Sequence, residues 1–165
     1  MQHLHAVTRD DEPEAGFTLI ELMMVVLIIA ILVAVLIPTF VGAKSRAQDR
    51  AVQTSVRNAL TAAKVIFSDH GDYTEATIAA LTSAEPSIGF VDATTTPSNP
   101  NAVSVDPVST NYFVVAGQSK TASCFFVRDD ESVGGTGERY AKATSGACTA
   151  SAAPAANSPS WGSTW

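Results

Sequence analysis

The sequence predicts an α+β fold in which one long N-terminal helix precedes a small antiparallel β-sheet. Three observations lead to this prediction: an early apolar run, an amphipathic helical pattern directly after it, and short β-branched and aromatic runs in the C-terminal half. The chain has 165 residues and a formal charge of −6, which fits one modest domain with an appendage. Its Lys and Arg residues are few and dispersed in the sequence, so no basic patch indicates nucleic-acid binding.

The early apolar run is long enough to cross a membrane. Every residue from Leu22 to Ile37 is apolar, and the segment 17–41 would extend roughly 37 Å against a hydrocarbon core of about 30 Å. Its Leu, Ile and Val residues favour insertion by roughly 4–7 kcal/mol, against about 3 kcal/mol for one charge at mid-membrane, so Glu21 near one end does not prevent insertion. We reject a cleaved secretory signal peptide, whose apolar core is usually about 7–15 residues; a simple signal anchor stays an alternative.

The helical pattern continues beyond the apolar run and becomes amphipathic. We predict one helix from Phe17 to His70, with 17–41 transmembrane, 42–71 amphipathic and Gly71 as its C-cap. Pro38 and Gly42 are expected to bend this helix without ending it. One face is apolar, and Asp49, Gln53 and Arg57 are expected on a solvated stripe. The apolar face consists of Val52, Val56, Ala59, Leu60, Ala63 and Phe67.

Residues 72–150 are predicted to form a globular head. A short helix is expected from Thr74, as N-cap, to Leu81, followed by an irregular loop over 84–109 because this stretch is rich in Pro, Ser, Thr and Asn. Strands are predicted at 111–117, 122–128 and 139–144. We expect the sheet to pack on the distal helix and to bury Phe67, Tyr112, Val114 and Phe126.

The two ends of the chain are predicted to lack regular structure. Residues 1–16 are polar and without helical period, which favours a disordered leader. Residues 151–165 are rich in Ala, Pro and Ser with two Trp, and we interpret them as a flexible tail.

The two cysteines, Cys124 and Cys148, lie far beyond the apolar run. If the C-terminal part is exported, a disulfide between them is the natural interpretation. It would close a loop of about 25 residues and contribute roughly 3 kcal/mol to stability. Two unrelated buried thiols are the alternative.

The stretch Gly16-Phe-Thr-Leu-Ile-Glu21, followed by the apolar helix, resembles the class III signal sequence of the type IV pilin and pseudopilin family. The resemblance covers roughly residues 15–42, and the positions of Pro38, of Gly71-Asp72-Tyr73 and of the cysteine pair also agree with it. It implies the pilin fold, a long helix packed on a small antiparallel head. It implies no catalytic residue, cofactor or metal.

The resemblance also implies a processing route. A prepilin peptidase would cut between Gly16 and Phe17 and then N-methylate the new amine of Phe17. Before assembly the chain would cross the inner membrane once, in contact with lipid, with residue 1 in the cytoplasm and the head exported. Implied partners are the peptidase, the pilus assembly platform with its ATPase, and further copies of the chain in a helical, extracellular filament. Nucleic acid would be a partner only of a DNA-uptake pilus.

Glu21 acquires a candidate partner through this processing. The new amine on Phe17 is a cation in an apolar layer, and two opposite buried charges are each costly alone but far less so together. Our hypothesis is that Glu21 of one copy pairs with the Phe17 amine of its neighbour during filament assembly. A tolerated carboxylate near the helix end is the alternative.

Three functions therefore compete. The first is a pilus subunit serving adhesion, motility or DNA uptake, and the second is a pseudopilin of a type II secretion or competence system. Many such pseudopilins bind calcium, and Asp129, Asp130 and Glu131 offer oxygen ligands; consecutive strand residues alternate in direction, so a solvated hairpin turn is the preferred interpretation. The third is a membrane-anchored exported enzyme, for which His70, expected near a helix end, is more typical of a dipole partner than of a catalyst.

Overall fold

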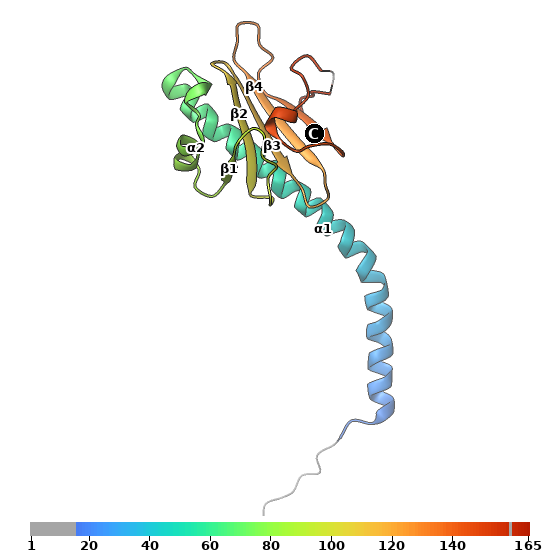
Figure 1. Ribbon diagram of the computed structural model, residues 1–165. Helices are drawn as coiled ribbons and strands as arrows, with labels where there is room; N and C mark the ends of the chain where they lie inside the picture. The colour runs from blue at the N-terminus through green and yellow to red at the C-terminus, as the bar shows by residue number, and fades with distance from the viewer. Residues whose placement is uncertain (1–15, 159) are drawn as a thin grey trace, which may run out of the picture. The chain divides into compact units, whose positions relative to one another are not determined.

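The computed structural model describes residues 16–158 and 160–165 and confirms the α+β fold. The helices are α1 (Leu19–His70) and α2 (Ile78–Ala84), with short 3₁₀ turns η1 (Tyr73–Glu75) and η2 (Ala150–Ala152). Within the described residues, one sheet has the order β1 (Gly89–Val91), β2 (Ala102–Ser109), β3 (Tyr112–Gln118), β4 (Cys124–Asp130) and β5 (Arg139–Ala143) (Figure 1). β1 pairs with β2 in parallel, and the other pairs are antiparallel. The predicted leader 1–16 lies outside the described residues except for Gly16.

The chain divides into two compact units between Val41 and Gly42. In the first unit, the described part is the apolar start of α1, whose large side chains are all exposed. α1 continues through Pro38 and Gly42, and it ends as predicted at His70 with Gly71 at φ +72°. The bend predicted at Pro38 and Gly42 stays a prediction.

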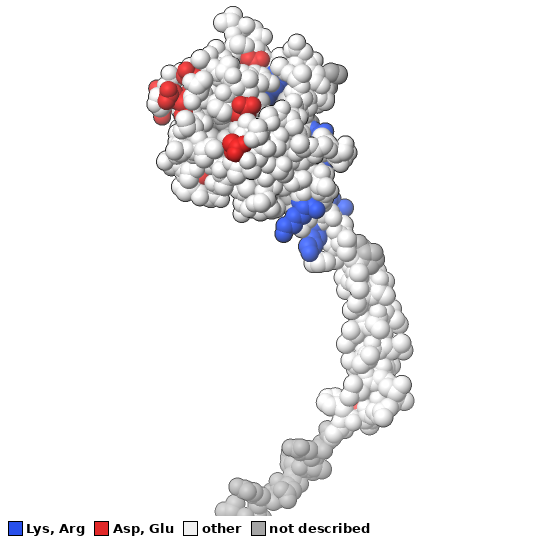
Figure 2. All heavy atoms as spheres, in the orientation of Figure 1, with Lys and Arg blue, Asp and Glu red and all other residues white. Residues whose placement is uncertain are grey.

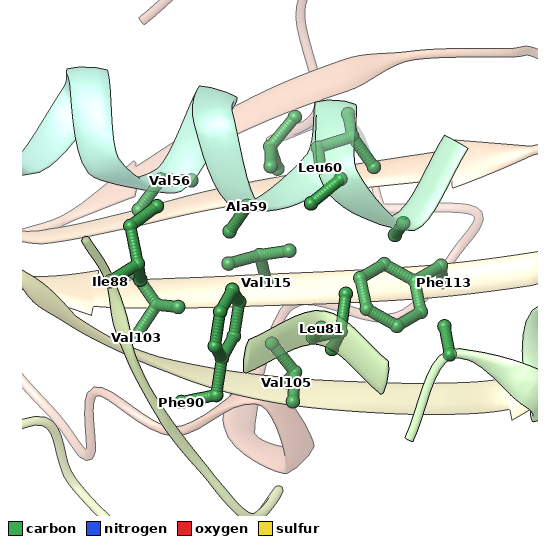
Figure 3. Packing of buried hydrophobic residues seen from close by; sticks show 14 of the residues in the cluster. Val56, Ala59, Leu60, Leu81, Ile88, Phe90, Val103, Val105, Phe113 and Val115 are labelled. Atoms are coloured by element: carbon green, nitrogen blue, oxygen red, sulfur yellow. The ribbon is translucent and has the colours of Figure 1, made fainter. Parts of the chain in front are cut away.

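The second unit has its main core between α1 and the sheet. Val56, Ala59 and Leu60 of α1 face strand residues of β2 and β3 (Figure 3). β3 approaches α1 so closely that a Cβ on Gly117 would lie 2.6 Å from Val56 Cγ2, so this position accepts no side chain without displacement of the helix. The predicted apolar face of 42–70 is thereby confirmed, with Phe67 only partly buried.

The prediction of which sheet face meets α1 was wrong. Val114 and Phe126 are buried, but they lie in a second cluster together with Ala116 and Cys148. The residues of β3 and β4 that pack against α1, in the main core, are those next to Val114 and Phe126 in the sequence: Phe113, Val115, Phe125 and Val127. Because both faces of these strands are apolar, alternation alone does not indicate which face the helix covers.

The predicted irregular loop 84–109 and the predicted cap of the helix before it also need correction. The loop contains β1 and β2, and Pro107 lies beyond the part of β2 that β1 covers and beside a register shift, where a sheet tolerates proline. Thr77, rather than Thr74, caps α2 by accepting a hydrogen bond from the Ala80 amide. Of the four prolines that suggested a loop, only Pro107 lies within a strand, and the other three lie before β1 or between β1 and β2.

Residues 151–165 pack on the head, which corrects the flexible tail. Gly162 bridges to Tyr140, and the Trp165 ring lies edge-on to Phe125 with its Nε1 donating to the Phe126 carbonyl at 3.1 Å. The segment covers the edge of β5 and part of the sheet (Figure 1). Two indole rings bring enough apolar surface to hold a segment that is otherwise small and polar.

The solvated stripe on α1 holds at Arg57, which is exposed, but not at Asp49, whose side chain is partly buried against the head. The Asp49 carboxylate accepts hydrogen bonds from Ser119 and Thr121 of the β3–β4 turn, at 2.6 and 2.7 Å. The Arg57 guanidinium lies 4.7 Å from the centre of the Trp165 ring. Both charges therefore connect the helix to distant parts of the head.

Candidate processing and assembly site

The first turn of α1 holds Glu21 by a reciprocal cap. Thr18 donates to the Glu21 carboxylate from its amide at 3.0 Å and from its hydroxyl at 2.8 Å, and the Glu21 amide donates back to the Thr18 hydroxyl at 3.3 Å. This is a capping box, in which two otherwise unpaired amides of the helix start are satisfied. The Thr-x-x-Glu spacing was present in the sequence, and our sequence interpretation did not use it.

The predicted scissile bond lies just outside this helix. Gly16 and Phe17 have no regular secondary structure, both are exposed, and Phe17 retains 87% of its accessible surface. A Cβ placed on Gly16 would meet no atom within 4 Å. The backbone between Gly16 and Phe17 is thus open to an incoming active site, and Glu21 follows it by one helical turn.

The surface that follows Glu21 is apolar on all sides. Large side chains between Leu19 and Val41 keep from 43% to 76% of their surface exposed, with Val33 and Leu19 at the two limits. By length and composition this part of α1 is one helix able to cross a membrane. A surface of this kind is hidden from water either by lipid or by other protein.

The acidic run is the solvated turn that we preferred only at its end: Glu131 is exposed just after β4, whereas the two Asp residues before it belong to the strand. Asp129 is fully buried, where its carboxylate accepts a hydrogen bond from the Tyr73 hydroxyl at 2.5 Å and lies 3.1 Å from the Lys64 ammonium. Lys64 also lies 3.4 Å from Glu138. The ammonium therefore occupies the place between these carboxylates that a bound cation would take.

This buried network shifts three pKa values. Burial and the hydrogen bond to Asp129 both raise the pKa of Tyr73. Burial alone would lower the pKa of Lys64, but Asp129 and Glu138 outweigh it and raise that pKa. The neighbouring Asp129 raises the pKa of the Glu131 carboxyl, chiefly by a hydrogen bond. Among the described residues, no group of His, Cys, Asp and Glu has an arrangement that could hold a metal ion.

The predicted disulfide joins Cys124 at the start of β4 to Cys148, just before η2, with the two Cα atoms 5.3 Å apart. Both cysteines are buried in the second cluster. The bond thereby fixes the C-terminal segment to the sheet face that α1 leaves uncovered.

These features define a membrane-inserting helix that carries a disulfide-bonded head. Residues 13–37 match the family model described as the prokaryotic N-terminal methylation motif, which is the class III signal peptide of type IV pilins and pseudopilins. No curated protein and no solved structure matches the chain. The motif implies processing by a prepilin peptidase and membrane anchoring before assembly, and it points to a structural subunit rather than an enzyme.

Proposed function

We propose that this chain is a type IV pilin, a subunit that polymerises through its N-terminal helix into an extracellular filament. The observation that carries the proposal is the methylation motif at residues 13–37, which runs into the part of α1 whose large apolar side chains are exposed. Lipid covers this surface before assembly, and the same helices of other copies cover it afterwards. Adhesion, motility and DNA uptake are all compatible with such a filament.

Glu21 has a different partner at each stage of this process. In the uncut chain the capping box with Thr18 satisfies its carboxylate. Cleavage after Gly16 adds an ammonium on Phe17, one turn away, in a medium where an unpaired charge is costly. A neighbouring copy that brings its own Glu21 to this ammonium neutralises both charges, so register between adjacent helices is set by electrostatics.

A pseudopilin of a secretion or competence system is the alternative, since the motif serves both classes. The environment of Asp129 favours the pilin. Its carboxylate is committed to Tyr73 and Lys64 inside the head, so the acidic run that suggested a calcium loop already has a cation of its own.

The test compares Glu21→Gln with Glu21→Ala in cells that express the full chain. Gln preserves the capping box but has no charge, whereas Ala removes both. If charge pairing drives assembly, both variants are cut after Gly16, enter the membrane and form no filaments. Glu85→Gln is the matched control: this head carboxylate is half-buried, among the described residues it accepts hydrogen bonds only from the neighbouring Ser87, and the variant should assemble normally.

If Glu21→Gln formed as many filaments as the wild type, the charge pairing would be contradicted. Glu21 would then serve only to cap the helix. Mass spectrometry of purified filaments checks processing independently: the first residue should be an N-methylated Phe17. Surface material that still begins at Met1 would contradict the pilin assignment.

A further inference from the structure

Basic side chains that are dispersed in the sequence gather at one end of the head. Lys44, Arg46 and Arg50 are exposed at the beginning of the second unit. Lys120 and Lys142 lie near them, because both are held close to Asp49 of the same helix. The residues on either side of Lys120, Ser119 and Thr121, donate hydrogen bonds to the Asp49 carboxylate. The Lys142 ammonium lies 3.9 Å from this carboxylate. Figure 2 shows basic side chains, in blue, gathered at one end of the head. We call these five residues the basic collar.

The basic collar has little internal neutralisation. Asp49 is the carboxylate nearest to it, and Ser119, Thr121 and Lys142 already engage that group. Within residues 16–158 and 160–165, no carboxylate lies at ion-pair distance from Lys44, Arg46 or Arg50. Their charge is therefore free to act on a partner.

The opposite end of the head is acidic. Asp69 lies in the last turn of α1, and Asp72 and Glu75 follow in and beside η1. Glu131 lies beside them, because both segments bond to the same turn. The Tyr73 amide donates to the Thr110 carbonyl at 2.8 Å, and the Glu131 amide donates to the carbonyl of the next residue, Asn111, at 2.9 Å. We call these four residues the acidic end. At 1.5 Å per residue, α1 separates Lys44 from Asp69 by about 38 Å.

A molecule with opposite charges at its two ends associates in one direction. Contact between unlike ends is attractive and contact between like ends is repulsive, which selects a head-to-tail arrangement. Such a contact joins two different surfaces of the same chain, and where its rotation does not close into a ring it repeats as a helical array. Because the Debye length at physiological salt is about 8 Å, this selection acts only when the ends are nearly in contact.

We propose that the basic collar of one copy docks on the acidic end of the next copy along the filament and thereby fixes a common polarity of the heads. The inference rests on the proposed filament but uses none of the residues of the processing site. Anionic lipid headgroups would also attract a basic collar directly after an apolar helix. The complementary charge on the same chain favours a second copy as the partner.

Charge exchange tests the proposal in the full chain. Arg46→Glu with Arg50→Glu reverses the collar, and Asp69→Lys with Glu75→Lys reverses the acidic end. The side chains of Asp69 and Glu75 form no hydrogen bond or ion pair with other described residues, so their reversal leaves the head intact. Each pair alone should lower the filament yield per inserted subunit about tenfold, and the four changes together should restore it to within about threefold.

The control is Glu85→Lys, which reverses a half-buried acid outside the acidic end, removes only the local hydrogen bonds from Ser87, and should leave the yield unchanged. Solubilised full-length chain provides a second readout: at low salt, cross-linking between copies should fall with either pair and return with all four. Single pairs without effect on both readouts, or four changes without restoration, would overturn the proposal. So would a loss confined to membrane insertion, which would identify lipid as the partner of the collar.

Failure of the proposed function is distinguishable from failure of this inference. If the proposed function is wrong, the wild-type chain yields no filaments. Cross-linking of solubilised copies then still tests whether the basic collar and the acidic end attract each other. If only the inference fails, wild-type filaments persist, Glu21→Gln still abolishes them, and the charge reversals change nothing.

Discussion

Asp129 is a buried charge that the head accommodates with two partners of different kinds. The Tyr73 hydroxyl donates to one carboxylate oxygen, and the Lys64 ammonium lies beside the other. Burial of a carboxylate is costly unless hydrogen bonds and an opposite charge compensate it. Tyr73 is itself fully buried, stacked between Phe67 and Phe113, so this acid is connected to the aromatic part of the core.

The first residue-scale prediction concerns Tyr73→Phe. The variant keeps the ring and removes a hydrogen bond to a charged group, so the free energy of unfolding should fall by about 1.5–3 kcal/mol near neutral pH. Denaturant unfolding of the full chain in detergent measures this fall. Tyr112→Phe, on the other face of the sheet, is the control and should cost less, because the Tyr112 hydroxyl makes only a 3.5 Å contact with Arg128.

Tyr73→Phe should also change how the free energy of unfolding depends on pH. The pKa of Tyr73 is raised in the folded head. The protonated hydroxyl therefore contributes its full stabilisation below the unfolded pKa of about 10, and this stabilisation is lost as the pH rises above that value. The raised pKa of Lys64 acts in the same direction. Wild-type stability should therefore decline above about pH 10, and Tyr73→Phe should decline less steeply, by up to about 1.4 kcal/mol per pH unit. An equal decline in both proteins would contradict this assignment.

The sequence predicted the role of a single residue correctly where its partners are close to it in the sequence. Gly71 and the apolar face of α1 follow from spacing along one helix, and the capping box of Thr18 and Glu21 was readable in the same way. The partners of Asp49 and Asp129 lie 56 to 93 residues away in sequence, and local patterns carry no information on such pairs. A charge that looked solvated was for this reason predicted wrongly at both positions.

At the scale of elements, each sheet face acquires its cover from a different end of the chain. α1 covers one face, where Trp165 joins its cluster, and the part of the C-terminal segment with Cys148 and η2 packs against the other. The sequence predicted three of the strands, because β3, β4 and β5 are rich in β-branched and aromatic residues. It did not predict β1 and β2, whose pairing depends on long-range contacts that outweigh their prolines and polar residues.

Trp165 provides the test of the C-terminal segment. Trp165→Ala removes a ring that contacts Phe125, Tyr140 and Arg57, and because the side chain is only partly buried we expect a loss of about 2–3 kcal/mol, below that of a fully buried Trp. Trp165→Phe keeps much of the apolar contact and loses the hydrogen bond to Phe126, at about 1 kcal/mol. The measurement is thermal unfolding followed by near-ultraviolet circular dichroism.

Ser163→Ala, at an exposed position of the same segment, is the matched control and should change stability by less than about 0.5 kcal/mol. If Trp165→Ala were equally neutral, the segment would be the flexible tail that the sequence first suggested.

At the scale of the whole molecule, the two units meet opposite physical requirements. The unit that ends at Val41 exposes its apolar side chains, so it needs lipid or other copies. The unit that begins at Gly42 encloses two clusters and holds its own disulfide. Assembly can therefore use the first unit while the second remains folded throughout.

The last prediction follows from this division. In the part of the chain that the structure describes, the buried core residues all lie at or after Val52. A fragment of residues 42–165 should consequently fold alone, form the Cys124–Cys148 bond and unfold cooperatively, with a free energy of unfolding within about 1 kcal/mol of that of the full chain. Leu60→Ala in the same fragment should lower that free energy by about 2–5 kcal/mol, because it opens a cavity under α1, and so verifies that the assay reports on the core. The fragment should form no filaments, since it lacks the apolar helix through which we propose that the copies assemble. A fragment without a cooperative transition would make the head dependent on the first unit, and a fragment that polymerised would remove the N-terminal helix from the assembly mechanism.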